Sequence, residues 1–310
     1  MIPTRARNAT DRFGRWAAGI RDRTRAPDRT AAFTEFLALL EREPQPIADT
    51  ERFYEALAQA PLSEADAVDL IERHTAEDDY WRFHRRRFGE QFSLFSHVCE
   101  RFEVKRILDI STTPFATGVF KRYRPDLDLV TIDLPRKLGG PPIATDPWYE
   151  PWGIDRHFAV DLNSADLTTL ADDLASGGRF DVVFACEVVE HLRVDFSEVV
   201  DLCLSVIRPG GLVIVTTPSF HSEWKLRLIT DGKSPQQRFH NYKDSPGGYH
   251  YREYTMKELR EIVNHAGGTT LAQVYSDALI DDAERLTGEQ DYLLRENMVY
   301  VFSDTDVSLW

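Results

Sequence analysis

The stretch that decides the fold is residues 180–192, Phe-Asp-Val-Val-Phe-Ala-Cys-Glu-Val-Val-Glu-His-Leu. Its first half is a short run of β-branched and aromatic residues, which is typical of a buried strand. Two glutamates and a histidine follow, where such a strand would end. Titratable side chains in this position indicate a ligand site, because open α/β sheets bind ligands beyond the carboxyl ends of their strands.

Similar runs alternate with helical patterns on both sides of this stretch. The expected strands are residues 104–110, 127–133, 157–162, 180–185, 211–217, 270–275 and 298–302. The expected helices are residues 115–124, 165–176, 196–207 and 255–266. Such alternation predicts an α/β, Rossmann-like fold with a mostly parallel, seven-stranded sheet and helices on both faces.

The first third of the chain has a different pattern. Apolar residues spaced three and four apart predict helices at residues 31–42, 49–60, 62–74 and 76–102. We therefore expect a basic N-terminal arm (1–30), a helical cap region (31–103) and a sheet domain (104–310). Two stretches fit neither a strand nor a helix, and we interpret them as inserts at residues 134–156 and 220–251.

The composition argues against several classes of function. A net charge of −14 disfavours a nucleic-acid partner, although the arm carries eight arginines against three aspartates. Neither a run of about 18 apolar residues nor a signal-peptide pattern is found, so we expect no membrane partner. Cys99, Cys186 and Cys203 are odd in number and far apart, which argues against disulfides and a zinc site and fits a reducing cytoplasm.

Two strand ends carry acidic residues that could hold a nucleotide-like cofactor. The first strand leads through Asp109 into a tight turn and a helix, and backbone N–H groups at such a turn face a ligand. The second strand ends at Asp133, where a carboxylate can accept hydrogen bonds from ribose hydroxyls.

Three motifs in order carry a family resemblance: residues 178–192, residues 207–219 (Ile-Arg-Pro-Gly-Gly-Leu-Val-Ile-Val-Thr-Thr-Pro-Ser) and residues 250–259 (His-Tyr-Arg-Glu-Tyr-Thr-Met-Lys-Glu-Leu). Over residues 104–302 the chain resembles class I S-adenosylmethionine-dependent methyltransferases, the large group that includes ubiquinone, sugar and natural-product methyltransferases. The resemblance implies S-adenosyl-L-methionine as the cofactor and a small-molecule acceptor as the partner. A homodimer is left open.

The resemblance also implies roles for single residues. Asp109 and the turn after it would hold the methionine end of the cofactor, Asp133 the ribose, Asp161 and Leu162 the adenine, and Cys186 and Glu187 the region near the sulfonium. The full predicted set is Asp109, Ser111, Thr112, Thr113, Pro114, Asp133, Leu134, Asp161, Leu162, Cys186 and Glu187. The first turn departs from the family, because Ser111–Pro114 stand where glycines are usual and the first glycine is Gly118.

The acceptor is expected to be a hydroxyl, since the Pro-Pro-Tyr type of motif of amide and nucleobase N-methylation is absent after the fourth strand. A hydroxyl needs a base, and histidine suits neutral pH. The candidates are His250, then His221, then His191, and no metal is expected. Two other functions stay open: a catalytically silent, methyltransferase-like binding module, and an NAD-dependent oxidoreductase, which should show a Gly-x-Gly-x-x-Gly turn that this chain lacks.

Overall fold

The computed structural model describes residues 44–63, 66, 68–69, 79–110, 120–135, 153–230, 234, 250–276 and 297–310. Residues Gln45–Trp310 form one compact unit. The expected arm and the helix expected at residues 31–42 lie outside the described residues. The helices described below belong to the same compact unit as the sheet, while the three-part division of the chain stays a prediction.

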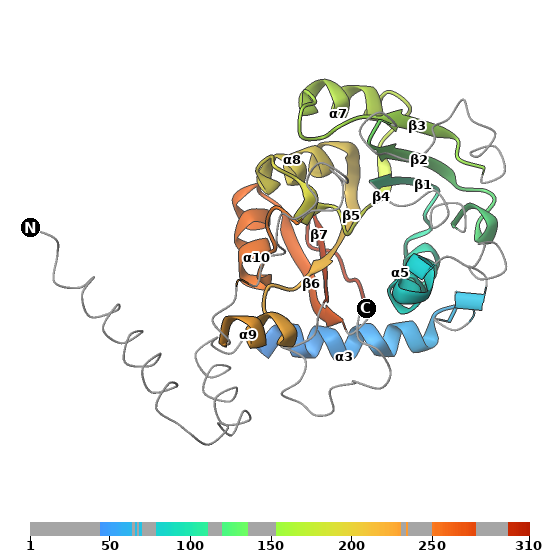
Figure 1. Ribbon diagram of the computed structural model, residues 1–310. Helices are drawn as coiled ribbons and strands as arrows, with labels where there is room; N and C mark the ends of the chain where they lie inside the picture. Colours follow the sequence, from blue (N-terminus) through green and yellow to red (C-terminus); the bar gives the residue numbers. More distant parts are fainter. Residues whose placement is uncertain are drawn as a thin grey trace, which may run out of the picture. The chain divides into compact units, whose positions relative to one another are not determined.

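Seven strands form one sheet in the order β3-β2-β1-β4-β5-β7-β6, which confirms the predicted α/β fold (Figure 1). β7 runs antiparallel to both of its neighbours, and the other neighbouring pairs are parallel. The strands are β1 (Arg106–Ile110), β2 (Asp128–Asp133), β3 (Arg156–Ala159), β4 (Phe180–Cys186), β5 (Ile207–Pro218), β6 (Thr269–Ser276) and β7 (Asn297–Ser303).

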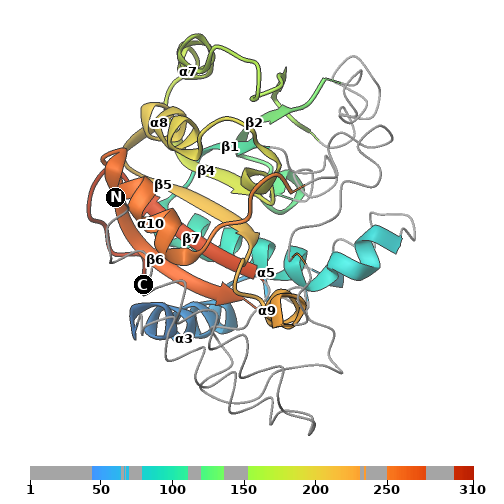
Figure 2. The same cartoon turned by 60° about the vertical axis from the view of Figure 1, so that its left-hand side comes forward.

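Helices cover both faces of the sheet, as Figures 1 and 2 show. One face packs against α7 (Leu167–Ala175), α8 (Phe196–Val206) and α10 (Met256–His265). The opposite face packs against α3 (Pro44–Gln59) and α5 (Asp79–Phe102). In the part of the chain that the structure describes, the helices are too short or too polar to cross a lipid bilayer.

Neighbouring residues of each strand enter opposite cores, which explains the continuous apolar runs. In β1, Leu108 packs on the α7, α8 and α10 side, whereas Ile107 packs on the α3 and α5 side. Both side chains are fully buried. A strand that is buried on both faces has no polar side, so its sequence is apolar throughout and easily recognised.

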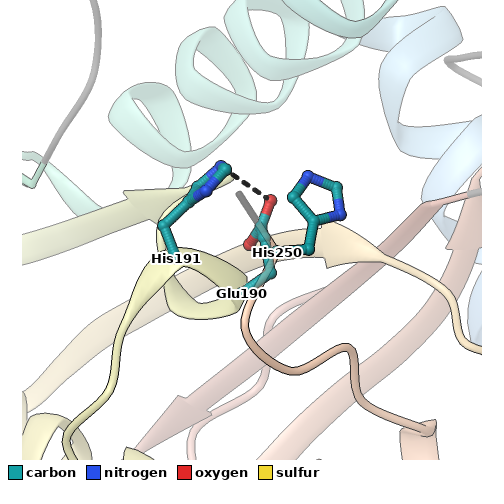
Figure 3. Close-up of side chains that lie close together, drawn as sticks. All are labelled: Glu190, His191 and His250. Atoms are coloured by element: carbon teal, nitrogen blue, oxygen red, sulfur yellow. Dashed lines mark ion pairs between the residues drawn. The ribbon is translucent and has the colours of Figure 1, made fainter. Parts of the chain in front are cut away.

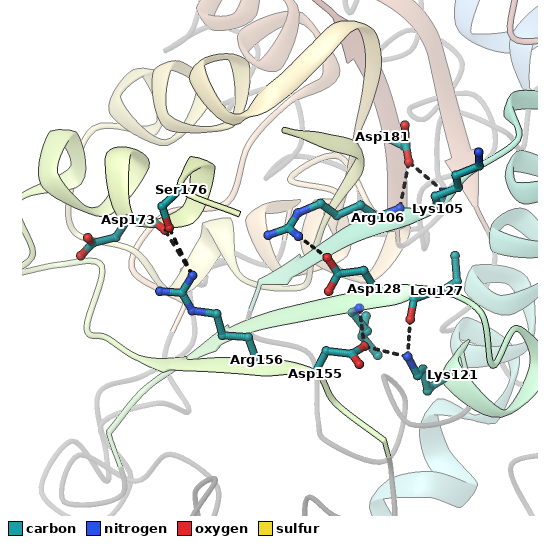
Figure 4. Close-up of polar contacts among 11 residues, drawn as sticks. Lys105, Arg106, Lys121, Leu127, Asp128, Asp155, Arg156, Asp173, Ser176 and Asp181 are labelled. Carbon is teal, nitrogen blue, oxygen red and sulfur yellow. Dashed lines mark hydrogen bonds and ion pairs between the residues drawn. The ribbon is translucent and has the colours of Figure 1, made fainter. Parts of the chain in front are cut away.

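Charged side chains join the starting ends of the strands (Figure 4). Asp181 at the start of β4 accepts hydrogen bonds from the backbone N–H groups of Lys105 and Arg106, both at 2.8 Å. Arg106 also forms an ion pair with Asp128 of β2. These contacts fix the register of three adjacent strands at the amino edge of the sheet.

The outer edge of β6 is bonded to α3. The backbone N–H of Gln273 donates to Asp49 Oδ2 at 2.9 Å, and that of Tyr275 donates to Thr50 Oγ1 at 3.1 Å. Two side chains from the first turns of α3 therefore take the place of a further strand at this edge.

The second predicted insert is partly wrong, because a helix forms inside residues 220–251. This helix, α9, spans Glu223–Thr230. Its apolar residues, at positions 224, 226, 228 and 229, are too few to form the extended apolar stripe that identifies an amphipathic helix. Its position depends instead on buried contacts of Lys225 and Leu226, which sequence periodicity does not report. Most other residues of the two inserts lie outside the described residues.

Candidate functional site

The strands β2, β1 and β4 are adjacent and parallel, so their carboxyl ends bring Asp133, Asp109 and Cys186 to one edge. Asp109 is 1% exposed. Burial, followed by the charge of Asp109, raises the pKa of the Cys186 thiol, which therefore stays protonated. The arrangement is the one expected for a cofactor that lies across the ends of these strands.

Asp133 is a partly buried carboxyl at the end of β2. Its Oδ1 accepts a hydrogen bond from the backbone N–H of Leu134 at 2.6 Å. Burial raises its pKa to about 7, the nearby charge of Asp109 adds to this rise, and the Leu134 bond opposes it. A pair of hydroxyl donors would stabilise the ionised form, so this carboxyl fits the ribose of S-adenosylmethionine.

Of the other residues predicted to bind the cofactor, the structure describes Asp161 and Leu162 but not the first turn. The turn Ser111–Pro114 lies outside the described residues. Asp161 begins a turn after β3, where its Oδ1 accepts from the backbone N–H of Asn163 at 2.9 Å. Leu162 is buried in the core on the α7 side. The adenine contacts of Asp161 and Leu162 stay predictions.

Glu187 follows β4 with a left-handed backbone, at φ 56°. Its Oε1 accepts hydrogen bonds from Thr216 Oγ1 at 2.8 Å and Asn297 Nδ2 at 3.0 Å. Its Oε2 lies 3.3 Å from the guanidinium of Arg87 in α5. The carboxylate thus joins α5 to β5 and β7, and its predicted contact near the sulfonium stays a prediction.

Glu190 lies in a 3-10 turn, η3 (Val189–His191), and is 1% exposed. Thr217 Oγ1 donates to its Oε2 at 2.9 Å. Burial raises the pKa of this carboxyl well above its ordinary value, and the charge of Glu187 adds to the rise. Burial thus favours the protonated form of this carboxyl, in which it can donate a hydrogen bond.

Two of the three predicted histidines come together around Glu190 (Figure 3). The ring centroids of His191 and His250 are 4.9 Å apart, and His191 Nε2 lies 3.8 Å from Glu190 Oε1. One nitrogen or oxygen from each of the three residues lies within 4.8 Å of the others, a spacing that a divalent cation could also bridge. The expected absence of a metal stays a prediction. His221 follows β5, with its ring 6.0 Å from that of Phe220.

The sequence interpretation missed Glu253, which contacts His250, and Lys225, which contacts Glu253. His250 Nδ1 lies 2.6 Å from Glu253 Oε1, and Glu253 Oε2 lies 2.5 Å from Lys225 Nζ. Glu253 stands three residues after His250 in a stretch already recognised as a motif, and this spacing was the available signal. Lys225 had no such signal in the sequence, because lysines are rarely fully buried and this one would be expected at the surface.

The polar side of α5 was also missed. The sequence predicts a helix at residues 76–102, and Phe88, Phe92 and Phe95 of α5 are buried in the core. In the same helix, Arg87 lies 3.3 Å from the Glu187 carboxylate. Gln91 Nε2 donates a hydrogen bond to Thr216 Oγ1, also at 3.3 Å. The helical region thus contacts the carboxyl edge of the sheet directly.

Comparisons with known proteins agree with this geometry. A family model described as a methyltransferase domain matches residues 80–273. A ubiquinone biosynthesis O-methyltransferase of Colwellia psychrerythraea is 27% identical over 117 residues, which cover 33% of this chain and 47% of that protein. A protein of the same name from Cereibacter sphaeroides is 32% identical over 110 residues, which cover 32% of this chain and 38% of that protein.

The chain thus spans less than half the length of these two curated relatives. Among solved structures, a SAM-dependent methyltransferase from Archaeoglobus fulgidus has a TM-score of 0.46 and 13% identity, covering 73% of this chain and 99% of that chain.

The family model covers more than half of the chain and includes the strand ends that carry Asp109, Asp133 and Cys186. The sheet has the strand order and the single antiparallel strand described above. The chain therefore belongs to the class I S-adenosylmethionine-dependent methyltransferases.

Proposed function

We propose that this chain transfers a methyl group from S-adenosylmethionine to a hydroxyl oxygen of a small molecule, with a sugar or another natural product as the acceptor class. The observation that carries the proposal is His250, which meets Glu253 at 2.6 Å beside the carboxyl ends of β4 and β5. The relatives described above are named as O-methyltransferases, which supports oxygen as the acceptor atom.

Bound S-adenosylmethionine supplies a methyl carbon that is activated by the positive sulfur next to it. Asp133 and Asp109 hold its ribose and methionine ends. The rest of the work is to align the acceptor hydroxyl and to remove its proton. His250 Nε2 takes that proton, because Nδ1 is engaged by Glu253. Glu190 and His191 lie beside His250.

The expected acceptor pocket comprises the inserts at residues 134–156 and 220–251 and the N-terminal helices, and most of the two inserts lies outside the described residues. The protein works in a reducing cytoplasm, which fits the three free, buried cysteines. Its net charge of −14 is unsuited to a nucleic-acid partner. A homodimer stays one of the assemblies to be tested.

Calorimetric titration with S-adenosylmethionine, S-adenosylhomocysteine and NAD tests the cofactor. We expect both sulfur compounds to bind and NAD to fail, and the reverse would favour an oxidoreductase. Transfer of a labelled methyl group is then measured against a panel of small phenols and sugars.

His250→Ala should lose on the order of 10²–10⁴ in turnover and keep its cofactor affinity, because a general base contributes about that much. A variant within tenfold of the wild type would show that positioning alone drives transfer. Cofactor binding without transfer to any acceptor would favour the silent binding module.

A further inference from the structure

His250, Glu253 and Lys225 form a row of three partly or fully buried side chains that contact one another in this order. Glu253 lies between His250 and Lys225, with one carboxylate oxygen at 2.6 Å from His250 Nδ1 and the other at 2.5 Å from Lys225 Nζ. The side chains of Glu253 and Lys225 are 5% and 1% exposed. Lys225 also donates to the backbone carbonyl of Ser219 at 2.8 Å.

The charges along this row determine where the imidazole carries its proton. The Lys225 ammonium neutralises the Glu253 carboxylate, so this buried carboxylate does not require a charged histidine beside it. A carboxylate only accepts hydrogen bonds, and a neutral imidazole that faces one must therefore donate from that nitrogen. With the proton on Nδ1, the Nε2 atom of His250 keeps its lone pair.

The backbone that carries His250 and Glu253 is fixed as well. The N–H groups of Tyr251 and Arg252 donate to the carbonyl of Glu190 at 2.7 and 3.3 Å. The N–H of Phe220 donates to the carbonyl of Tyr254 at 3.0 Å. The segment is thus tied to η3 and to the end of β5, which keeps the ring in one place relative to the sheet.

We propose that Glu253, held by Lys225, is a positioning residue that keeps His250 in the tautomer with its proton on Nδ1. Nε2 is then free to accept the proton of an acceptor hydroxyl, as the O–H bond breaks and an N–H bond forms. The resulting imidazolium is stabilised by the same carboxylate. The role of Nε2 rests on the proposed function, whereas the tautomer can be observed without any acceptor.

Glu253→Gln separates this role from a merely structural one. The single amide oxygen must face the Lys225 ammonium, which only donates, so the amide NH₂ must face His250 Nδ1. That nitrogen then has to accept, and the proton moves to Nε2. In the double variant Lys225→Met, Glu253→Gln the amide can turn, and its oxygen can again accept from Nδ1.

Glu258→Gln is the matched control, because this carboxylate lies on the same segment. It bonds the backbone N–H of Thr255 at 2.9 Å and the Arg252 side chain at 3.1 Å rather than His250.

The test uses the full chain labelled with ¹⁵N-histidine, in EDTA so that a bound cation does not set the tautomer, and at alkaline pH so that the neutral ring is observed. We expect two-bond ¹H–¹⁵N spectra to show the proton of His250 on Nδ1 in the wild type, the control and the double variant, and on Nε2 in Glu253→Gln. A wild-type ring with its proton on Nε2 overturns the proposal, even if Glu253→Gln does not fold. An unchanged tautomer in a folded Glu253→Gln protein also overturns it.

Reaction with diethyl pyrocarbonate, mapped to His250 by peptide mass spectrometry, reports the Nε2 lone pair independently. The rate should fall at least about tenfold in Glu253→Gln and return to within about threefold of the wild type in the double variant. If the tautomer changes as expected while Glu253→Gln retains methyl transfer, the tautomer assignment stands and the proposed role of His250 as base fails.

Discussion

At the level of single residues, the raised pKa of Asp133 links the cofactor site to folding stability. Burial and the charge of Asp109 raise this pKa from 3.8 to about 7. Between these values the folded chain holds a proton that the unfolded chain has already lost. Stability therefore falls as the pH rises through this window, by at most about 4 kcal/mol from this group, and changes no further above it.

Asp133→Asn should remove both the loss of folding stability at high pH and the charged contact with the ribose. We expect its free energy of unfolding in urea to exceed that of the wild type at pH 8, with little difference below about pH 4. Its affinity for S-adenosylhomocysteine should fall by roughly 1–3 kcal/mol, because hydrogen bonds to a charged group are lost. A folded variant whose calorimetric affinity is unchanged would contradict the ribose assignment.

The sequence located Asp109, Asp133 and Cys186 correctly at strand ends, because buried strands are easy to recognise and polar residues directly after them stand out. It could not show that Lys225 meets Glu253. These residues are 28 positions apart in sequence, and they come together only through the bond between α9 and the segment before α10. A contact between this short helix and an irregular segment has no periodic signature in the sequence.

At the level of elements, α10 begins with a capping box that residues 255–258 predict and the structure confirms. Thr255 Oγ1 accepts from the backbone N–H of Glu258 at 3.2 Å, and Glu258 Oε2 accepts from the backbone N–H of Thr255 at 2.9 Å. The cap also fixes the end of the preceding segment, which carries His250, because this segment leads directly into Thr255.

Thr255→Ala should lower the free energy of unfolding by about 1 kcal/mol, since the first turn of α10 loses a hydrogen-bond acceptor. Urea unfolding followed by circular dichroism measures this. Thr168→Ala is the control: Thr168 is exposed in the first turn of α7, where Asp166 provides the cap, and the change should stay within about 0.5 kcal/mol. Equal effects of the two changes would contradict the role of the cap.

The strands were predicted to within a few residues, whereas α9 was not predicted at all. Burial on both faces makes the central strands β1 and β4 largely apolar. α9 is eight residues long, and a helix of that length owes its stability to its tertiary contacts rather than to its own sequence. The predicted strand at residues 157–162 also ends early, at Ala159, because Asp161 starts a turn.

At the level of the whole molecule, aromatic packing joins α5 to the sheet. Phe95 is fully buried, its ring stacks on Phe120 at 4.1 Å, and Phe184 of β4 lies 6.1 Å away. Because Gln45–Trp310 form one compact unit, we expect the helical region and the sheet to unfold together.

Phe95→Ala should destabilise this unit by about 3–5 kcal/mol, owing to the lost burial and the cavity left behind. Far-ultraviolet circular dichroism and tryptophan fluorescence should report the same shifted urea midpoint. Phe102→Ala, at a partly buried position on the same helix, should cost less. Two separate transitions would instead indicate that the helical cap region folds independently.

The bonds from α3 to the edge of β6 also bear on assembly. A second copy of the chain that extends the sheet at the β6 edge must pair with this strand, and Asp49 and Thr50 already occupy the N–H groups of Gln273 and Tyr275. α3 therefore competes, within the same chain, with any incoming strand at this edge. Two copies that associate without displacing α3 therefore cannot pair strands at the β6 edge. They must contact each other through a surface other than this edge.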